Sequence, residues 1–195
     1  MGSEVIQMKI SLDWVKPEIW RRFTIGSCFT LDNFHDAIQV IMGWTNSHLY
    51  GFSINGIEYV PSNDDFEQES EDTKGVTLQS LKLKVKDKIR YVYDFGDNWE
   101  HTVLIEKISK SDIESLIPVC LDGARNCPPD DCGSIPGYED MVEAMKKPKS
   151  KEAKELIEWL GEPYNSEKFN LEEINSIFQP KKKKQKIKKA GGLNK

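Results

Sequence analysis

The sequence predicts an α+β fold: an antiparallel sheet built from hairpins, one early helix at about residues 31–43, and a C-terminal group of three helices. Up to about residue 108, apolar and polar residues alternate in short runs separated by turn signals, which is the pattern of half-buried strands. Beyond Ser109, a stretch rich in proline and glycine leads into three segments with helical spacing of apolar residues. Strands joined as hairpins, followed rather than interleaved by helices, define the α+β class.

The first three elements are expected to be two strands and a helix. Residues 5–12 alternate, and a turn at Lys16-Pro17 leads into a second strand over residues 18–25. Thr30 is a suitable N-cap for the helix over residues 31–43. The apolar stripe of this helix consists of Leu31, Phe34, Ile38, Ile41 and Met42.

Two hairpins should follow. Asn55-Gly56 separates strands at residues 49–54 and 57–60, and this dipeptide suits a type I′ turn because both of its positions take positive φ. Residues 88–95 and 99–108 form the second hairpin. The residues expected to share a face are Ile89, Tyr91, Tyr93 and Phe95 on one strand and Trp99, His101, Val103 and Ile105 on the other.

Two stretches are expected to be loops, and three helices are expected after the second. Residues 61–75 hold six acids and one lysine and predict a flexible surface loop, whereas residues 118–137 hold four prolines and predict a stiff irregular one. Gly161 suits the end of the second of these helices, and Asn170 with Glu173 resembles a capping box for the third. The three apolar stripes are Tyr138, Met141, Val142 and Met145; Ala153, Leu156, Ile157 and Leu160; and Leu171, Ile174 and Phe178.

We expect a single domain over residues 1–179 and a lysine-rich disordered tail over residues 180–195, because 195 residues suffice for one sizeable core and are short for two. Eight lysines and no acid lie between Lys181 and Lys195. Without these eight of its 27 basic residues, the chain has 19 against 32 acidic residues, a net charge of −13. A domain with this negative charge repels nucleic acid, whereas Lys181–Lys195 attracts it weakly and non-specifically. The alternatives are a solvated end and a tail that folds back onto the acidic body.

The composition predicts a cytoplasmic protein with no membrane partner. No run of about 18 apolar residues exists, and the start of the chain lacks the features of a secretory signal. Disulfides are therefore not expected among the four cysteines, Cys28, Cys120, Cys127 and Cys132. Walker A, dinucleotide-binding, nucleophile-elbow and zincin motifs are absent from the sequence, which disfavours those enzyme classes.

The turn between Asp94 and His101 is the first candidate site, because carboxylates, a histidine and aromatic residues crowd around it. In the functional interpretation, Asp94, Asp97 and His101 hold a divalent metal or move a proton, and they are the candidate catalytic residues. In the structural interpretation, the polar residues only shape the turn. Clustered carboxylates cost stability unless a cation offsets them, and Arg22 or Arg125 could supply that counter-charge.

The cysteine-containing loop that follows is the second candidate site. Cys127 and Cys132 with a nearby aspartate could bind zinc, but no C-x2-C pair exists and the spacing matches no known zinc knuckle. The alternatives are buried reduced cysteines under a stiff loop, and a Cys/His nucleophile pair with His101 or His48.

Asp130 and Asp131 follow two prolines, which hold their carboxylates in a defined direction. They could meet Asp94 and Asp97 in an acidic pocket that binds metal. They could equally brace the irregular loop, or cap the helix that starts near Gly137. The first arrangement requires the turn of the second hairpin and the proline-rich stretch to lie side by side.

Several ordered segments resemble one known family. They are Ile19-Trp20-Arg21-Arg22; Ile41-Met42-Gly43-Trp44 with His48-Leu49; Tyr93 to His101; Cys127-Pro128-Pro129-Asp130-Asp131-Cys132-Gly133; and Gly137-Tyr138-Glu139. From about residue 5 to residue 178 the chain resembles the plasmid pRiA4b ORF-3-like family, whose members also occur as passengers of mobile elements. Asp130 and Ser134 depart mildly from the Pro-Pro-Glu-Asp and double glycine typical of the family. The resemblance implies an α+β fold and no established reaction.

Three functions remain open, and the sequence does not decide whether the protein is an enzyme. The first is a non-enzymatic binding or accessory module, with the hairpin end and the proline-rich loop as its recognition surface. The second is a metal-dependent, hydrolase-like enzyme that needs a divalent metal cofactor, with His101 as base. The third is a nucleic-acid accessory factor of mobile elements, based on the lysine tail and the resemblance. The candidate binding residues are Trp99, Glu100, Arg22, Arg125, Asp130, Asp131 and Tyr138, and the candidate metal ligands are Asp94, Asp97, Asp131, Cys127 and Cys132.

Overall fold

The computed structural model describes residues 3–62, 70–111 and 117–179, and within them the chain forms one eight-stranded sheet and four helices. The strands are β1 (Ser3–Leu12), β2 (Trp20–Gly26), β3 (Tyr50–Ile54), β4 (Ile57–Val60), β5 (Glu71–Asp72), β6 (Lys88–Tyr93), β7 (Trp99–Ser111) and β8 (Val119–Ala124). The helices are α1 (Leu31–Met42), α2 (Ser134–Met145), α3 (Lys151–Leu160) and α4 (Leu171–Phe178). The α+β class is confirmed. The expected lysine-rich tail and the middle of the expected acidic loop lie outside the described residues.

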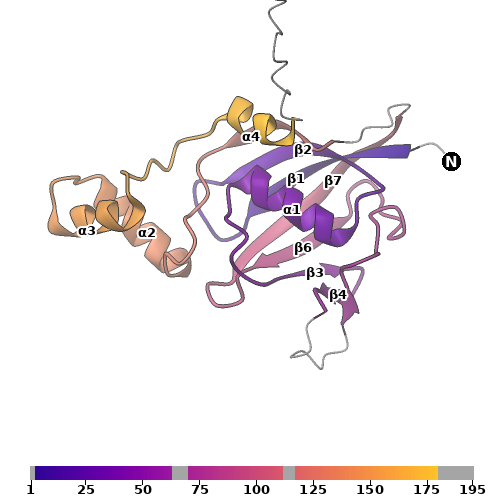
Figure 1. Ribbon diagram of the computed structural model, residues 1–195, viewed down its shortest axis with the longest axis horizontal. Helices are drawn as coiled ribbons and strands as arrows, with labels where there is room; N and C mark the ends of the chain where they lie inside the picture. The colour runs from indigo at the N-terminus through magenta and orange to yellow at the C-terminus, as the bar shows by residue number, and fades with distance from the viewer. Residues whose placement is uncertain (1–2, 63–69, 112–116, 180–195) are drawn as a thin grey trace, which may run out of the picture.

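The sheet has the order β5-β4-β3-β6-β7-β1-β2-β8. All neighbouring strands pair antiparallel except the short β4–β5 pair, which is parallel, so the purely antiparallel sheet of the prediction needs this correction. The two longest strands, β1 and β7, pair from one end to the other and lie side by side within the sheet (Figure 1). This pairing attaches the second hairpin directly to the start of the chain.

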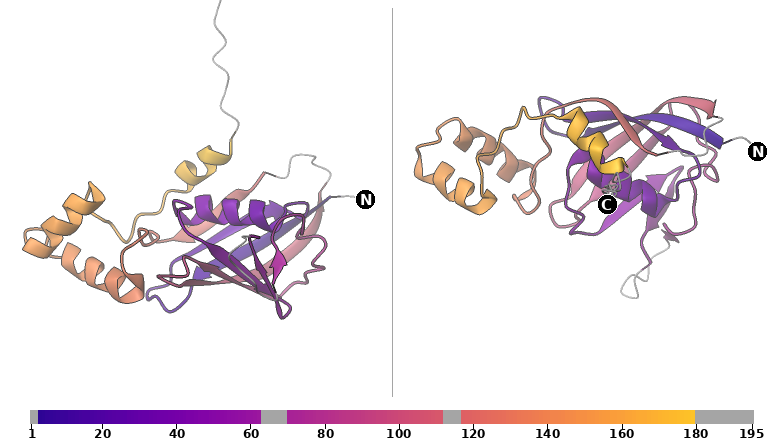
Figure 2. Two further views of the ribbon diagram at one scale, coloured as in Figure 1. Left: turned by 60° about the horizontal axis from the view of Figure 1, so that its bottom comes forward. Right: turned by 45° about the horizontal axis from the view of Figure 1, so that its top comes forward.

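Helix α1 lies across one face of the sheet, and in the described part of the chain no helix covers the other face (Figure 2). The Phe34 ring of α1 stacks on Phe52 of β3 with ring centres 5.4 Å apart, and Leu31 and Ile38 are fully buried beside it. Burying each such side chain contributes about 1.5–3 kcal/mol. Gly43 ends the helix in the left-handed conformation that glycine adopts without strain, at φ 104°. The helix therefore fixes which face of the sheet is core and which is surface.

Several local expectations are confirmed. Asn55 and Gly56 both have positive φ, 53° and 82°, as a type I′ turn requires. Asn170 accepts a hydrogen bond from the backbone N–H of Glu173 at the start of α4. Thr30 occupies the N-cap position of α1, but its side chain makes no capping hydrogen bond.

The expected C-terminal group of three helices is only partly right. Helices α2 and α3 pack on each other beyond one end of the sheet, whereas α4 packs on β8 and α1 (Figure 1). The segment between α3 and α4 runs past the start of the proline-rich stretch, where the Tyr164 hydroxyl donates to the carbonyl oxygens of Asn126 and Cys127. This tether separates α4 from the other two helices.

Two residue-level expectations were wrong. Residues 118–137 were predicted to be loop, but β8 forms within them because it pairs with β2, a long-range contact that its flanking prolines obscure in the sequence. Phe95 was expected to share a face with Tyr91 and Tyr93, which are fully buried, and is instead 45% exposed. Strand β6 ends at Tyr93, and Asp94 with φ 55° turns the backbone, so the period-two pattern stops before Phe95.

Helix α4 covers the edge of the sheet at β8. The backbone N–H of Cys120 donates to Oδ1 of Asn175 over 2.8 Å, and Nδ2 of Asn175 donates to the carbonyl oxygen of Cys120 over 2.9 Å. One side-chain amide thus satisfies both backbone groups at this position of the edge strand. None of the helices in the described ranges has the length and apolar character needed to cross a bilayer.

Candidate metal centre

The turn between β6 and β7 and the proline-rich loop before α2 lie in contact. We call residues 94–98 the hairpin turn and residues 126–133 the proline loop. Oδ2 of Asp97 accepts a hydrogen bond from the backbone N–H of Gly133, and the hydroxyl of Ser134 donates to the carbonyl oxygen of Asp97 over 2.7 Å. The juxtaposition that an acidic pocket requires is therefore present, and Asp97 serves to hold the two segments together.

Asp94 shapes the hairpin turn with one of its carboxylate oxygens. Oδ1 accepts from the backbone N–H groups of Gly96 and Asp97, at 2.9 Å and 3.3 Å, which is a local turn motif that aspartate favours. The residue is only 6% exposed. The second oxygen, Oδ2, faces away from these N–H groups and lies 3.7 Å from Nε2 of His48.

The backbone makes a tight turn at the end of the proline loop, just before α2. Asp131, Gly133 and Ser134 all have positive φ, at 59°, 88° and 62°. A Cβ on Gly137 would lie 1.9 Å from the carbonyl oxygen of Cys132, so only glycine fits there. This tight return presents the carboxylate of Asp131 toward His48, with Oδ1 at 3.3 Å from Nε2.

His48 joins the two segments into one cluster. It lies in the connection between α1 and β3, and its Nε2 together with one oxygen each from Asp94 and Asp131 lie within 4.8 Å of one another. Nε2 is buried and has no hydrogen-bond partner among the described residues. One imidazole nitrogen and two carboxylate oxygens form a ligand set that suits a divalent cation.

Asp130 and Tyr93 brace the connection that carries His48. Oδ2 of Asp130 accepts hydrogen bonds from the backbone N–H and the hydroxyl of Thr45. The Tyr93 hydroxyl accepts from the backbone N–H of Ser47 over 3.0 Å. Burial raises the pKa of Tyr93 to about 12, and the negative charge of Asp130 adds to this effect. Asp130 thus braces the connection between α1 and β3 rather than the irregular loop, and its other oxygen, Oδ1, is buried without a partner in the described ranges.

His101 lies elsewhere, in the aromatic core between α1 and the sheet. It is fully buried, its ring centre lies 5.3 Å from that of Tyr91, and it meets Trp44 edge-on. Burial lowers its pKa to about 4, so the ring is neutral at pH 7. The structure therefore replaces His101 with His48 beside the carboxylates. The sequence signal for His48 was weak, a loop position just before a strand.

The remaining candidate binding residues do not join this cluster. Arg22 forms a two-pronged ion pair with Glu106, and Arg125 pairs with Glu167, so neither arginine offsets the clustered carboxylates. Glu100 pairs with Arg90 on the open face of the sheet. The last two candidate binding residues are Trp99 and Tyr138, which are buried aromatic residues of the core.

The cysteines carry free thiols. Burial raises the pKa of Cys127 well above its ordinary value, and it raises that of Cys132 to about 12, with the charge of Asp97 contributing. Both side chains are therefore thiols rather than thiolates at neutral pH in the metal-free protein, which disfavours a role as nucleophile. Their surroundings match buried reduced cysteines under a stiff loop.

Comparison with known proteins gives a consistent result. A family model described as plasmid pRiA4b ORF-3-like protein matches residues 4–173, which include the hairpin turn and the proline loop. The uncharacterized protein y4hQ of Sinorhizobium fredii is 33% identical over 177 residues, which are 90% of this chain and 91% of that protein. The crystal structure of MM3350, a protein of unknown function from Methanosarcina mazei Go1, is similar with a TM-score of 0.78 and 30% identity, covering 88% of this chain and 98% of that one.

Proposed function

Given a chain that belongs to the plasmid pRiA4b ORF-3-like family, we propose that it is a binding module that holds a divalent cation between the hairpin turn and the proline loop. His48 would provide Nε2, and Asp94 and Asp131 would each provide one carboxylate oxygen. The observation that carries the proposal is the convergence of these three ligand atoms to within 4.8 Å of one another, from three separate parts of the chain.

The charge balance supports a cation at this position. The hairpin turn and the proline loop together bring four aspartates into one region, and like charges in proximity cost stability unless they are offset. Arg22 and Arg125, the two arginines expected to compensate, pair with glutamates elsewhere. A divalent cation would offset two of these negative charges.

The ligand set also narrows the choice of ion. Calcium takes oxygen ligands, whereas one imidazole with two carboxylates suits Mn²⁺, Fe²⁺ or Zn²⁺. Three protein ligands leave coordination positions open to water or to a group on a partner. A bound cation would also add a second link between the proline loop and the hairpin turn, beside the contacts of Asp97.

Metal titration of the chelator-treated protein tests the proposal. An ion at one hundred times its Kd that binds only the folded state adds about 2.7 kcal/mol to the free energy of unfolding, which is measured as a rise in melting temperature. His48→Ala and Asp131→Asn should each weaken Mn²⁺ or Zn²⁺ binding by at least about tenfold. Asp140→Asn, which removes an exposed acid from α2, is the control and should bind normally. Unchanged binding in both site variants would refute the proposal.

A metal-dependent hydrolase is a second candidate, favoured by the number of protein ligands. Catalytic zinc sites typically combine three protein ligands with one water, whose pKa the metal lowers toward neutrality. Asp130 adjoins the ligand Asp131 and has a buried oxygen without a partner in the described residues, so it would be the candidate base. Chromogenic ester and phosphodiester substrates, assayed with the metal-loaded protein, provide the test. If the protein binds the metal but turns over these substrates no faster than the Asp130→Asn variant does, the enzyme is excluded and the binding module remains.

A further inference from the structure

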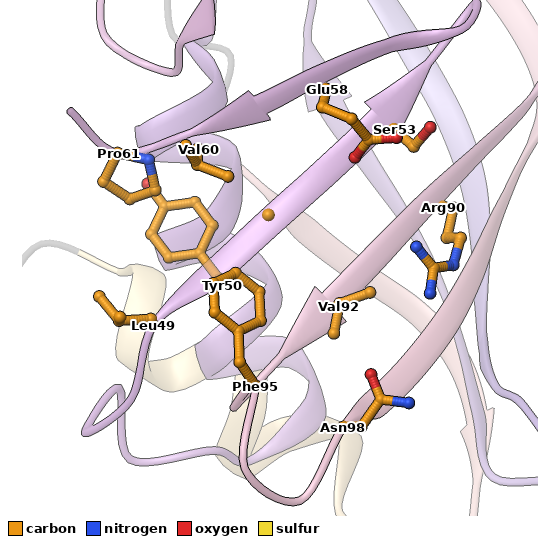
Figure 3. A pocket seen from close by; sticks show the side chains of 11 residues that line it. Leu49, Tyr50, Ser53, Glu58, Val60, Pro61, Arg90, Val92, Phe95 and Asn98 are labelled. Carbon is orange, nitrogen blue, oxygen red and sulfur yellow. The ribbon is translucent and has the colours of Figure 1, made fainter. Parts of the chain in front are cut away.

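The open face of the sheet carries a hollow at β3, β4 and β6 (Figure 3). Residues of β3 alternate, so Tyr50, Phe52 and Ile54 enter the core, while Gly51 and Ser53 face outward. Gly51 pairs with Val92 on β6, and a Cβ on Gly51 would lie only 3.2 Å from Cγ1 of Val60 on β4. A cavity of about 270 Å³ lies over this part of the sheet, with Gly51, Val60 and Val92 among the residues that line it.

One end of the hollow is apolar. Leu49, Phe95, Val60 and Pro61 surround it, as the left half of Figure 3 shows. Leu49 and Phe95 are large apolar side chains that remain 43% and 45% exposed, and a Cβ on Gly51 would come within 3.6 Å of the Phe95 ring. A ligand with an apolar group would bury these surfaces, and each buried methylene contributes about 0.8 kcal/mol.

The other end of the hollow is polar and carries both signs of charge. Ser53 pairs with Glu58 on β4 and with Arg90 on β6, so these two charged residues stand two strand spacings apart, roughly 10 Å. They form no ion pair with each other, and Glu58 has no ion-pair partner in the described residues. In Figure 3 the two side chains and Asn98 border the same side of the hollow.

Arg90 is held in a fixed orientation. Its Nη2 donates to Oε1 of Glu100 over 2.5 Å, and the other oxygen of Glu100 accepts from the indole N–H of Trp14 over 3.0 Å. The nitrogens Nε and Nη1 make no hydrogen bond to the described residues and remain available as donors. A guanidinium oriented in this way suits a carboxylate, because little side-chain freedom is lost on binding.

We propose that this hollow binds an apolar α-amino acid. Its ammonium group would pair with Glu58, its carboxylate would pair with Arg90, and its side chain would lie over Gly51 against Leu49 and Phe95. A cavity of about 270 Å³ lies near the lower limit of typical ligand sites, roughly 300 Å³, which fits one amino acid rather than a longer peptide. The site lies on the outer face of the sheet, and none of its proposed ligand contacts uses His48, Asp94 or Asp131.

Isothermal titration with leucine, methionine and phenylalanine tests the ligand class. Leucine should bind, and N-acetyl-leucine and leucinamide, which each lack one charge, should bind at least tenfold more weakly. Aspartate and lysine lack the apolar group and should not bind. Binding of both blocked leucines as tightly as leucine itself, or no binding of any apolar amino acid, would overturn the proposal. Tight binding of only the leucinamide form would indicate a peptide amino terminus as the ligand.

Matched variants test the location. Gly51→Ala places a methyl group at the hollow, 3.2 Å from Cγ1 of Val60 and at a position without positive φ, so it should weaken leucine binding at least tenfold. Glu58→Gln should weaken binding at least tenfold, whereas Glu71→Gln on the neighbouring strand β5 should not. Normal binding in both Gly51→Ala and Glu58→Gln would rule out this site. Methyl NMR of the unmodified protein gives an independent readout, because leucine should shift the signals of Val60 and Val92 and leave those of core residues unchanged.

Discussion

The buried guanidinium of Arg21 donates from Nε to the carbonyl oxygen of Ile41, in the last turn of α1, over 3.1 Å. Its Nη1 donates to the carbonyl oxygens of Trp20 and Ala124, and the guanidinium lies 4.8 Å from the centre of the Phe169 ring. The residue is 2% exposed, and the negative end of the helix dipole helps to compensate its charge. One side chain thus ties β2 to α1, to β8 and to the segment before α4.

Arg21→Lys should lower the free energy of unfolding by about 2–4 kcal/mol, because an ammonium group cannot reach three carbonyl oxygens with the planar fork of arginine. Arg22→Lys is the control on the same strand. Arg22 pairs with Glu106 at a partly exposed position, so its loss should be below about 1 kcal/mol. Urea unfolding measures both values, and equal losses would contradict the structural role assigned to Arg21.

The stability of the protein should fall as the pH decreases from about 6.5 to about 4. Burial lowers the pKa of His101 to about 4, so in this window the unfolded chain binds a proton that the folded protein does not. The free energy of unfolding should therefore be about 2 kcal/mol smaller at pH 5 than at pH 7 from this residue alone. Burial also lowers the pKa of His35, which adds to the same trend.

His101→Phe isolates the contribution of His101. The substitution keeps a ring in the core and removes two nitrogens that have no hydrogen-bond partner among the described residues. The pH dependence of unfolding should become shallower by about 2 kcal/mol between pH 7 and pH 5, with His35 acting equally in both proteins. Denaturant titrations at the two pH values provide the measurement, and identical slopes would show that His101 does not titrate as its burial implies.

Gly137→Ala should weaken cation binding without direct contact with the cation. A Cβ at this position would overlap the carbonyl oxygen of Cys132, so the proline loop must shift and carry Asp131 with it. Gly161→Ala is the control, because a Cβ there meets nothing within 4 Å and costs about 1 kcal/mol only for the positive φ. Calorimetric titration with Mn²⁺ should show lost affinity in Gly137→Ala alone. Equal Mn²⁺ affinity in the two variants would show that the backbone geometry of the proline loop does not control cation binding.

Removal of residues 181–195 should abolish non-specific nucleic-acid binding. This segment holds eight lysines and no acid, whereas the rest of the chain has a net charge of −13. The affinity of the full chain should fall steeply between low and moderate salt, because binding releases counterions from the phosphates. Electrophoretic mobility shifts at two salt concentrations measure this. Retained binding after truncation would locate a nucleic-acid surface within residues 1–180 instead.

The features that local interactions determine were predicted best from the sequence. Asn55-Gly56 specifies its turn because the two residues tolerate positive φ, and the apolar stripe of α1 follows from helical periodicity alone. Phe95 shows the limit of this approach. Its direction depends on the positive φ of Asp94, which the alternating pattern does not encode.

The candidate site was harder to predict because it is assembled by long-range contacts. The sequence identified Asp94 and Asp131, and it identified the two segments that had to meet. It selected His101 as the associated histidine because that residue is near in sequence. The structure selects His48, which the connection between α1 and β3 brings to the carboxylates. The contacts of Thr45 and Ser47 that position His48 involve residues far away in the chain, and no local pattern marks them.

The amide of Asn175 has a consequence for how molecules of this protein meet one another. Exposed strand edges recruit strands from other chains, and this recruitment is a common start of aggregation. At Cys120, both backbone groups that a ninth strand would need are already bonded to a side chain carried on a helix. Growth of the sheet past β8 therefore requires α4 to detach first, which makes the docking of that short helix a safeguard of solubility.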